Sequence, residues 1–393
     1  MENRILAKAN SLDIEFNDGR KPMGSDETLS ESLPKRELPL SLVICSRADN
    51  YAGNSIYRLQ TSLNFLAFQL EALGRLNDVE VIVTDWGCET PLRQSMALSP
   101  SAAGMTRFLE VSPRLARDQQ NDSPFAEVIA NNASIRRSRG TYIGRIDQDT
   151  LVGSHFLKGF FNHVDGHKDV VPGALDTSFM FTGRYHVPLG YVRTLPDLTS
   201  VVSYIDALGP FLPRDGVCQR PWFDAPVGVA MMHRDLWHDC KGYDERLIYW
   251  GFMETDLALR INQKYSLLNI GPLLGRDLFH LSHTTQRIAV TNRRKNPRVT
   301  PQSFAPNGPN WGLGQHDLEL RKAVPSETSP VRSSALESGK WKLRAQHGPY
   351  VMQEYFWETA LTGPRFVRSL MLGDRIHAAS DPGHLHLDED VSK

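Results

Sequence analysis

The strongest candidates for chemistry in this sequence are two carboxylates and two histidines. Asp147 and Asp149 flank Gln148 directly after the apolar segment TYIGRI. Residues two apart in a strand share a face, so both carboxylates can address one cation where the strand turns into a loop. His280 and His283 lie three residues apart, a spacing that a helical or turn-like backbone can direct at one ion. Together these ligands predict a site for Mn²⁺ or Mg²⁺, and the nitrogen ligands favour Mn²⁺.

A second group of acidic residues opens a predicted helix that runs from Met253 to about Lys264. Glu254 and Asp256 lie in its first turn, where acidic side chains complement the helix dipole. That role is sufficient to explain one of the two. In a desolvated cleft, a carboxylate can instead act as a general base that accepts a proton from a hydroxyl nucleophile.

Alternating strands and helices are predicted to position these residues. Short apolar segments typical of buried strands alternate with segments of helical periodicity. Strands are predicted at Leu40–Cys45, Glu80–Thr84, Thr106–Val111 and Thr141–Ile146, and helices at Ile56–Leu73 and Ala126–Ser138. This order predicts βαβ units in an α/β, Rossmann-like fold with a mostly parallel sheet flanked by helices. Ligands of such sheets bind beyond the carboxyl ends of the strands, where Ser46, Arg47, Asp85 and Asp147 are found.

The middle of the chain has a weaker pattern. From Pro172 to Trp222 the sequence is rich in Pro, Gly and aromatic residues, which predicts loops of a length typical of a binding insertion. Regular structure is expected to return with a strand over Val227–Met232 and a helix over Asp235–Cys240.

Composition limits the class of protein. The chain has 393 residues, 40% of them hydrophobic, and a formal net charge of -1. This profile is typical of a soluble globular protein and removes the overall electrostatic case for nucleic acid as a partner. We find no apolar stretch long enough for a signal peptide or a membrane span, and the four cysteines are widely spaced. We therefore expect a reducing, cytoplasmic location and no integral membrane segment.

The two ends of the chain differ from its centre. Residues 1–38 are polar and lack hydrophobic periodicity, which predicts a flexible N-terminal extension. Residues 315–393 form a C-terminal extension with a helical, aromatic-rich segment. Its apolar stripe is expected to pack against the main domain, and a homodimer formed through this extension is an alternative.

Four motifs in order resemble a known enzyme family. SLVICSRADN, EVIVTDWG, NNASIRRSRGTYIGRIDQD and GVAMMHRDLWHDCKGYDERLIYWGFMETDLALRI are similar to the pattern of glycosyltransferase family 2 on the GT-A fold. The last motif and the histidines after it also resemble the galactosyltransferase carboxy-terminal module. The resemblance implies one GT-A domain over residues 39–314, with a nucleotide-binding half (39–150) and an acceptor and catalytic half (151–314).

The resemblance also implies a nucleotide-sugar donor, of the UDP-sugar type, and assigns residues to it. Ser46 and Arg47 would border the nucleobase or ribose, and Asp85 would contact the base. Asp147 and Asp149 match the family's metal and ribose motif, with Asp149 the direct metal ligand. The same resemblance implies hexosyl transfer to a hydroxyl-bearing acceptor.

The resemblance further implies that His280, His283 or both bind the metal. Glu254 falls where the family places its catalytic base, and inversion at the sugar is the expected outcome. The acceptor would contact the residues around this base, namely Trp250, Gly251 and Asp256.

Two residues depart from the family pattern. Met253 stands where a glutamate is expected, and Phe252 replaces the second glycine of Trp-Gly-Gly-Glu-Asp. These departures motivate an alternative: a non-catalytic protein that binds a nucleotide sugar or a carbohydrate on a glycosyltransferase scaffold. The joint presence of Asp149, Glu254 and the two histidines favours the enzyme.

Overall fold

The computed structural model describes residues 38–167, 173–214, 228–284, 295–297 and 303–326. The flexible extension expected at the N-terminus lies outside these residues except for Leu38. The aromatic-rich tail and the dimer expected from it concern residues 327–393 and also lie outside them.

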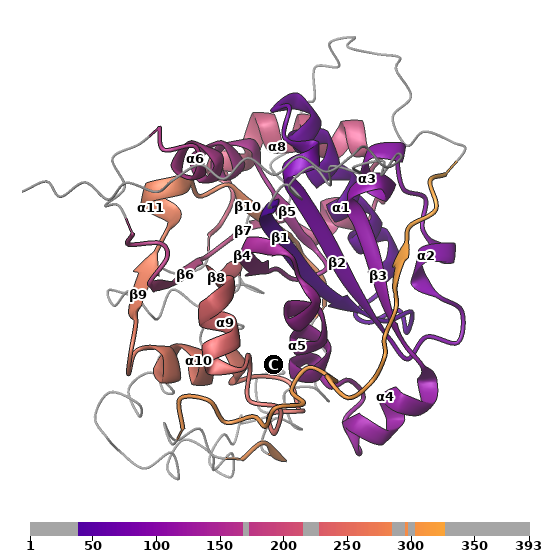
Figure 1. Cartoon of the computed structure of the whole chain (residues 1–393). Coiled ribbons are helices and arrows are strands. Elements are labelled where there is room, and N and C mark those ends of the chain that lie inside the picture. Colours follow the sequence, from indigo (N-terminus) through magenta and orange to yellow (C-terminus); the bar gives the residue numbers. More distant parts are fainter. Residues whose placement is uncertain (1–37, 168–172, 215–227, 285–294, 298–302, 327–393) are drawn as a thin grey trace, which may run out of the picture. The chain divides into compact units, whose positions relative to one another are not determined.

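A central eight-stranded sheet carries the fold (Figure 1). Its strands are β1 (Leu38–Ser46), β2 (Val79–Trp86), β3 (Thr106–Val111), β4 (Gly140–Arg145), β6 (Ser178–Thr182), β8 (Val229–His233), β9 (Ser266–Asn269) and β11 (Leu320–Lys322). They lie in the order β11-β3-β2-β1-β4-β8-β6-β9. The pairs β3–β2, β2–β1, β1–β4 and β6–β9 are parallel, and the remaining pairs are antiparallel. The predicted α/β fold with a mostly parallel sheet is confirmed.

Helices cover both faces of this sheet (Figure 1). One face packs against α1 (Ser55–Ala72), α3 (Pro100–Met105) and α6 (Ser154–Val164), and the other against α5 (Glu127–Arg137), α9 (Arg234–Cys240) and α10 (Met253–Ile261). Because side chains alternate along a strand, Leu42 and Ile44 of β1 join the first core and Val43 joins the second. The near-continuous apolar sequence of β1 thus follows from its burial on both sides.

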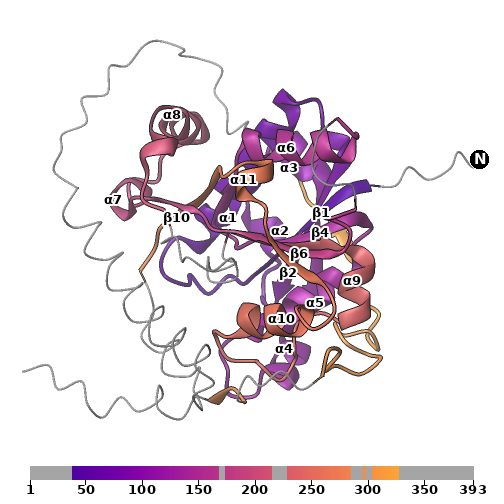
Figure 2. The same cartoon turned by 90° about the vertical axis from the view of Figure 1, so that its left-hand side faces the viewer.

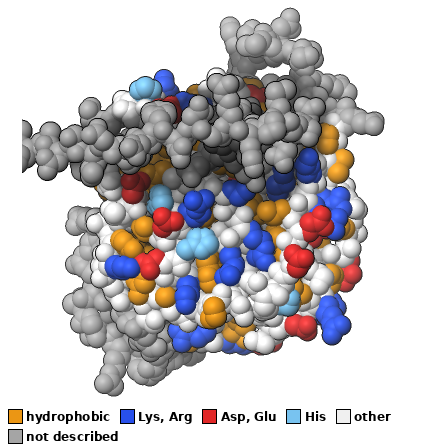
Figure 3. Space-filling view, in the orientation of Figure 1, with side chains coloured by type: hydrophobic (Ala, Val, Ile, Leu, Met, Phe, Trp, Pro, Cys, Tyr) orange, Lys and Arg blue, Asp and Glu red, His pale blue; other side chains and the backbone are white. Residues whose placement is uncertain are grey.

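The other helices are short or peripheral. They are α2 (Leu92–Ser95), α4 (Pro113–Gln120), α7 (Leu189–Val192), α8 (Leu198–Leu208) and α11 (Gly271–Leu274). Within the described residues, none of the helices combines the length and apolar character needed to cross a bilayer. On the face shown in Figure 3, basic and acidic side chains are interspersed with apolar ones.

A second, three-stranded sheet lies beside the large one. It consists of β5 (Thr150–Val152), β10 (Leu278–Leu281) and β7 (Tyr185–Val187), in the order β5-β10-β7. A third apolar cluster, which includes Val201, Ile205 and Phe279, packs α7 and α8 against this small sheet. Figure 2 shows α7 and α8 on the side of the molecule away from α9.

Two expectations need correction. The segment from Pro172 to Trp222 was expected to form loops, but its described part contains β6, β7, α7 and α8. The strands among them are short and pair with strands distant in the sequence, since β6 pairs with β8 and β9 and β7 pairs with β10. The histidine pair was expected on a helical or turn-like backbone, whereas His280 lies in strand β10 and His283 follows that strand.

Beyond residue 314, β11 pairs with β3, so ordered structure continues past the predicted end of the catalytic domain. The division of the chain at residues 39, 150 and 314 stays a prediction.

Candidate metal centre and acidic cluster

Strand pairing explains how residues distant in the sequence meet at Asp149. Strand β5 begins directly after Asp149, and its first residue, Thr150, is the register partner of His280 in β10. The backbone N–H of Leu281 also donates to the carbonyl oxygen of Asp149, at 2.9 Å. The small sheet therefore holds the β10 histidine beside the carboxylate that ends the Asp-x-Asp motif.

Asp149, His280 and His283 form a compact group of possible metal ligands. One ligand atom from each residue lies within 4.8 Å of the others. Oδ1 of Asp149 is 3.6 Å from Nε2 of His280, and Oδ2 is 3.3 Å from Nε2 of His283. The side chains of Asp149 and His280 are only 4% and 8% exposed. The three residues predicted as metal ligands thus lie together.

Unsatisfied polar atoms in this group fit a bound cation. Oδ1 of Asp149 and Nε2 of His280 are buried and have no hydrogen-bond partner among the described residues. Two atoms that each lie about 2.1 Å from an ion, at angles of roughly 90–120°, are separated by about 3.0–3.6 Å. Both Asp149–histidine distances fall in this range. One oxygen and two nitrogens suit Mn²⁺ better than Mg²⁺.

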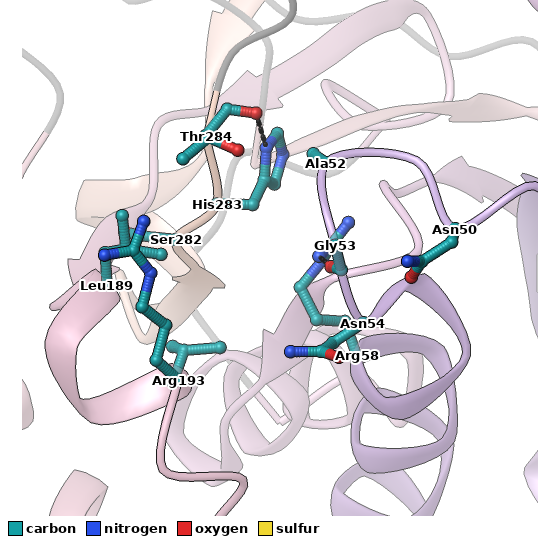
Figure 4. A pocket seen from close by; sticks show the side chains of 11 residues that line it. Asn50, Ala52, Gly53, Asn54, Arg58, Leu189, Arg193, Ser282, His283 and Thr284 are labelled. Carbon is teal, nitrogen blue, oxygen red and sulfur yellow. Dashed lines mark hydrogen bonds between the residues drawn. The ribbon is translucent and has the colours of Figure 1, made fainter.

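The hydrogen bond of His283 indicates which of its nitrogens can bind a metal. Nδ1 lies 3.2 Å from the backbone carbonyl oxygen of Thr284, which can only accept, so Nδ1 carries the proton (Figure 4). In the neutral imidazole, Nε2 then carries a lone pair and no proton, and it faces Oδ2 of Asp149. Two lone pairs facing one another in this way are stabilised by a cation between them.

Two arginines also approach Asp149. Nε of Arg58 is 3.4 Å from Oδ2, and Nη1 of Arg184 is 3.8 Å from Oδ1. Burial alone would raise the pKa of Asp149, but His280, His283 and Arg184 more than offset it and lower this pKa well below its usual range. Burial, together with Arg184, lowers the pKa of His280 far below its ordinary value. The group therefore presents an ionised carboxylate and a neutral imidazole, the forms that bind metals.

A second cluster surrounds the buried guanidinium of Arg145. Nη2 of Arg145 lies 2.5 Å from Glu127 and 2.6 Å from Asp147, and Nη1 lies 3.4 Å from Glu254. The side chain of Arg145 is 4% exposed, whereas the three carboxylates are 21%, 26% and 20% exposed. A buried cation thus holds three partly accessible carboxylates. Asp147 also accepts from Arg184 at 2.6 Å, which links this cluster to the metal group.

The charge balance of this cluster raises two carboxylate pKa values. Burial raises the pKa of Glu127 to about 7, with Glu254 and Asp147 adding to the increase and Arg145 opposing it. Burial also raises the pKa of Glu254, again against Arg145. Three carboxylates exceed the single charge of Arg145, so a proton is readily held within the cluster.

Sequence reasoning missed Arg145 and Glu127. A charged residue within the otherwise apolar TYIGRI segment signals a buried partner, and this signal points to Arg145. Glu127 lies in the first turn of α5, where an acidic residue needs no further explanation than the helix dipole.

The predicted nucleotide-binding residues lie along one edge of the sheet. Ser46 of β1 and Asp85 of β2 are register partners at the carboxyl ends of their strands. Ser46 donates to the side chain of Gln148 at 2.5 Å, and Arg47 forms an ion pair with Asp49. The Ser46–Gln148 contact links the end of β1 to the loop that holds the Asp-x-Asp motif.

Asp85 is buried and only partly satisfied. Its Oδ2 accepts from the backbone N–H of Leu92 at 2.7 Å, while Oδ1 has no hydrogen-bond partner among the described residues. Burial raises the pKa of this carboxyl. Asp85 also lines a cavity of about 360 Å³ with Cys88 and Glu110 among its walls. Contact with a nucleobase stays a prediction.

The predicted acceptor residues lie at the start of α10. Trp250 is 38% exposed, and Gly251 and Phe252 both have positive φ, at 96° and 71°. The second value is strained for a bulky residue, and it falls where the resembled motif has glycine. Asp256 is buried, and its carboxylate accepts from Nε of Arg260 at 2.7 Å within the helix. The assignment of these residues to an acceptor stays a prediction.

A cavity of about 400 Å³ adjoins the metal group (Figure 4). It lies between α7 and the loop before α1, and its walls include Arg58, Arg193, Asn54 and His283. Asn54 is the N-cap of α1 but has a left-handed backbone and makes no side-chain cap. Arg58 donates to the carbonyl oxygens of this loop and so keeps its guanidinium between the cavity and Asp149.

Comparison with known proteins gives structural likenesses only. No family model matches the chain, and no curated protein matches it. The solved structures that resemble it include S. aureus TarS, at 12% identity over 62% of this chain, with a TM-score of 0.36. TarS 1-349 in complex with UDP is also 12% identical over 62% of this chain (TM-score 0.37), and its complex with UDP-GlcNAc is 10% identical over 64% (TM-score 0.36). This chain spans 37% of the longer TarS chain and 60% of TarS 1-349.

Proposed function

We propose that this chain is a metal-dependent glycosyltransferase of the GT-A type. It moves a hexosyl group from a nucleoside diphosphate sugar, of the UDP-sugar class, to a hydroxyl acceptor. The observation that carries the proposal is the convergence of Asp149, His280 and His283 beside Asp147 at the carboxyl edge of the sheet. The order of sequence motifs that resembles glycosyltransferase family 2 supports the same assignment.

The donor's diphosphate is assigned to the cationic side of the site. Arg193 and the buried Arg58 line the cavity that His283 borders, so an anionic group bound there meets the guanidinium of Arg193 and lies in the positive field of Arg58. A divalent cation held by Asp149, His280 and His283 would stabilise the negative charge that develops on the leaving diphosphate. Asp147, placed between Arg145 and Arg184, is assigned to the ribose side of the donor.

Glu254 is assigned as the base. Its carboxylate is partly exposed and held by Arg145, and burial raises its pKa above that of an ordinary glutamate. The acceptor oxygen would attack the anomeric carbon as its proton passes to Glu254, while the bond from that carbon to the diphosphate oxygen breaks. The products are the glycoside, the nucleoside diphosphate and protonated Glu254, with inversion at the sugar.

The contact between Arg145 and Glu254 also favours a second candidate. An ion pair with a buried cation can make Glu254 a structural residue, in which case the chain would bind a nucleotide sugar without transferring it. Donor binding without turnover, across a broad set of acceptors, would support this candidate.

The direct test is a mass-spectrometric screen of nucleotide sugars against glycan and small-molecule acceptors, with and without Mn²⁺. We expect at least one nucleotide sugar to be consumed only in the presence of Mn²⁺, by transfer or by slow hydrolysis. The proposal is wrong if no nucleotide sugar binds or is hydrolysed in the presence of Mn²⁺.

A further inference from the structure

A third histidine contacts the candidate metal group from the side opposite Asp149. Strand β7 pairs in parallel with β10, and His186 is the register partner of His280. Their Nδ1 atoms lie 3.2 Å apart, and the two rings meet edge to face with centroids 5.3 Å apart. His186 is not among the three residues that can share one ion, so it contacts a ligand rather than the metal position.

The direction of this hydrogen bond follows from the other nitrogen of His280. One of the two Nδ1 atoms must carry a proton, because two lone pairs do not form a hydrogen bond. Nε2 of His280 has no hydrogen-bond partner among the described residues and lies 3.6 Å from Oδ1 of Asp149. A metal ion bound there needs the lone pair of Nε2. The proton of the neutral imidazole is then on Nδ1, which donates to Nδ1 of His186.

We propose that His186 is a positioning residue that holds His280 in the Nδ1–H form, with Nε2 turned toward the metal position. The backbone carbonyl of Thr284 plays the equivalent part for His283. Each histidine of the group then has one nitrogen fixed by a hydrogen bond and the other facing Asp149. Groups that hydrogen-bond a metal-ligating histidine typically change metal affinity by about 10–100-fold when they are removed.

This inference rests on the proposed metal site, and the experiment distinguishes a failure of the inference from a failure of the metal site. Two variants of the full chain distinguish a hydrogen bond from simple packing. His186→Asn retains an acceptor atom near the position of Nδ1, whereas His186→Phe retains a ring but has no acceptor. His155→Asn is the matched control, because the His155 side chain is 85% exposed.

The first readout is the Mn²⁺ dissociation constant, measured by electron paramagnetic resonance of the free ion. We expect His186→Phe to raise it by about 10–100-fold, and His186→Asn to raise it by less than about threefold. His155→Asn should leave it unchanged. Equal Mn²⁺ affinity in the wild type and in His186→Phe overturns the inference, and the absence of Mn²⁺ binding by the wild type overturns the metal site itself.

The second readout needs no metal. It is a nuclear magnetic resonance spectrum of the metal-free protein labelled with ¹⁵N-histidine. The signals of His280 are assigned by their loss in a His280 variant. We expect them to show a protonated Nδ1 and an unprotonated Nε2. In His186→Phe the two tautomers should become mixed. A wild-type His280 protonated at Nε2 would overturn the inference whatever the metal measurement gives. Thermal unfolding of each variant checks that it is folded.

Discussion

The guanidinium of Arg145 lies 3.4 Å from the carboxylate of Glu254 and is closer still to two other carboxylates. Glu254 therefore shares its cation with Glu127 and Asp147 rather than pairing with it alone. A carboxylate that is only partly neutralised keeps its affinity for a proton, which a general base requires. The same contact orients the side chain of Glu254.

Replacement of Glu254 by glutamine should separate binding from transfer. Glutamine preserves the shape of the side chain but does not accept a proton, so we expect Mn²⁺ and donor affinity to stay within about threefold and transfer to fall by roughly 10²–10⁴-fold. Isothermal titration with the donor and a turnover assay measure the two effects. Glu71→Gln, at an exposed position in α1, is the control and should leave both unchanged. Full turnover by Glu254→Gln would exclude the assigned role.

Asp149→Asn should remove metal binding and leave the fold intact. The amide is a poorer metal ligand than a carboxylate, and Asp149 is the residue that both histidines face. We expect the Mn²⁺ dissociation constant to rise by at least about 100-fold, beyond the effect typical of a residue that only supports a ligand. Asp118→Asn, at an exposed position in α4, is the control. Unchanged Mn²⁺ affinity in Asp149→Asn would contradict the proposed ligand set.

The parallel half of the sheet was predictable because its signals are local. Each of β1, β2 and β4 is rich in apolar residues and buried along most of its length, and apolar residues in the helices between them recur with helical spacing. The general rule that ligands bind beyond the carboxyl ends of such strands then led to Ser46, Asp85 and Asp147 without any tertiary information.

The parts of the site that come from the small sheet were not predictable in this way. Strands β5 and β7 have three residues each and β10 has four, too few to show a period, and their pairings join distant segments. His186 and Arg184 therefore gave no local signal. The two histidines of Phe279–His283 were recognised by residue type. Strand β10, which contains His280 and ends before His283, was not, because its pairing with β5 rather than local spacing sets the direction of His280.

Glu127 should make stability depend on pH near neutrality. Its pKa is about 7 in the folded protein against 4.5 for the ordinary side chain, so between these values the unfolded chain loses the proton and the folded chain keeps it. Stability from this group is thus complete below about pH 4.5 and falls as the pH rises to about 7. In urea unfolding, we expect Glu127→Gln to match the wild type near pH 5 and to exceed it at pH 8 by on the order of 1–3 kcal/mol.

The control for this prediction is again Glu71→Gln, which should follow the wild type at both pH values. A difference between Glu127→Gln and the wild type that is the same at pH 5 and pH 8 would show that Glu127 does not titrate in this range.

Arg193 should contribute to donor binding through charge alone. It is exposed at the end of α7 and lines the cavity that His283 and Arg58 share with the metal group. We expect Arg193→Met, which keeps much of the apolar stem, to weaken binding of UDP with Mn²⁺ by about 3–10-fold at low ionic strength. At about 1 M salt the Debye length falls to roughly 3 Å, so the difference from the wild type should shrink. Arg114→Met, at an exposed position in α4, is the control. Equal weakening by both variants would mean that the effect comes from the net charge of the protein, and unchanged binding in Arg193→Met would place the diphosphate outside this cavity.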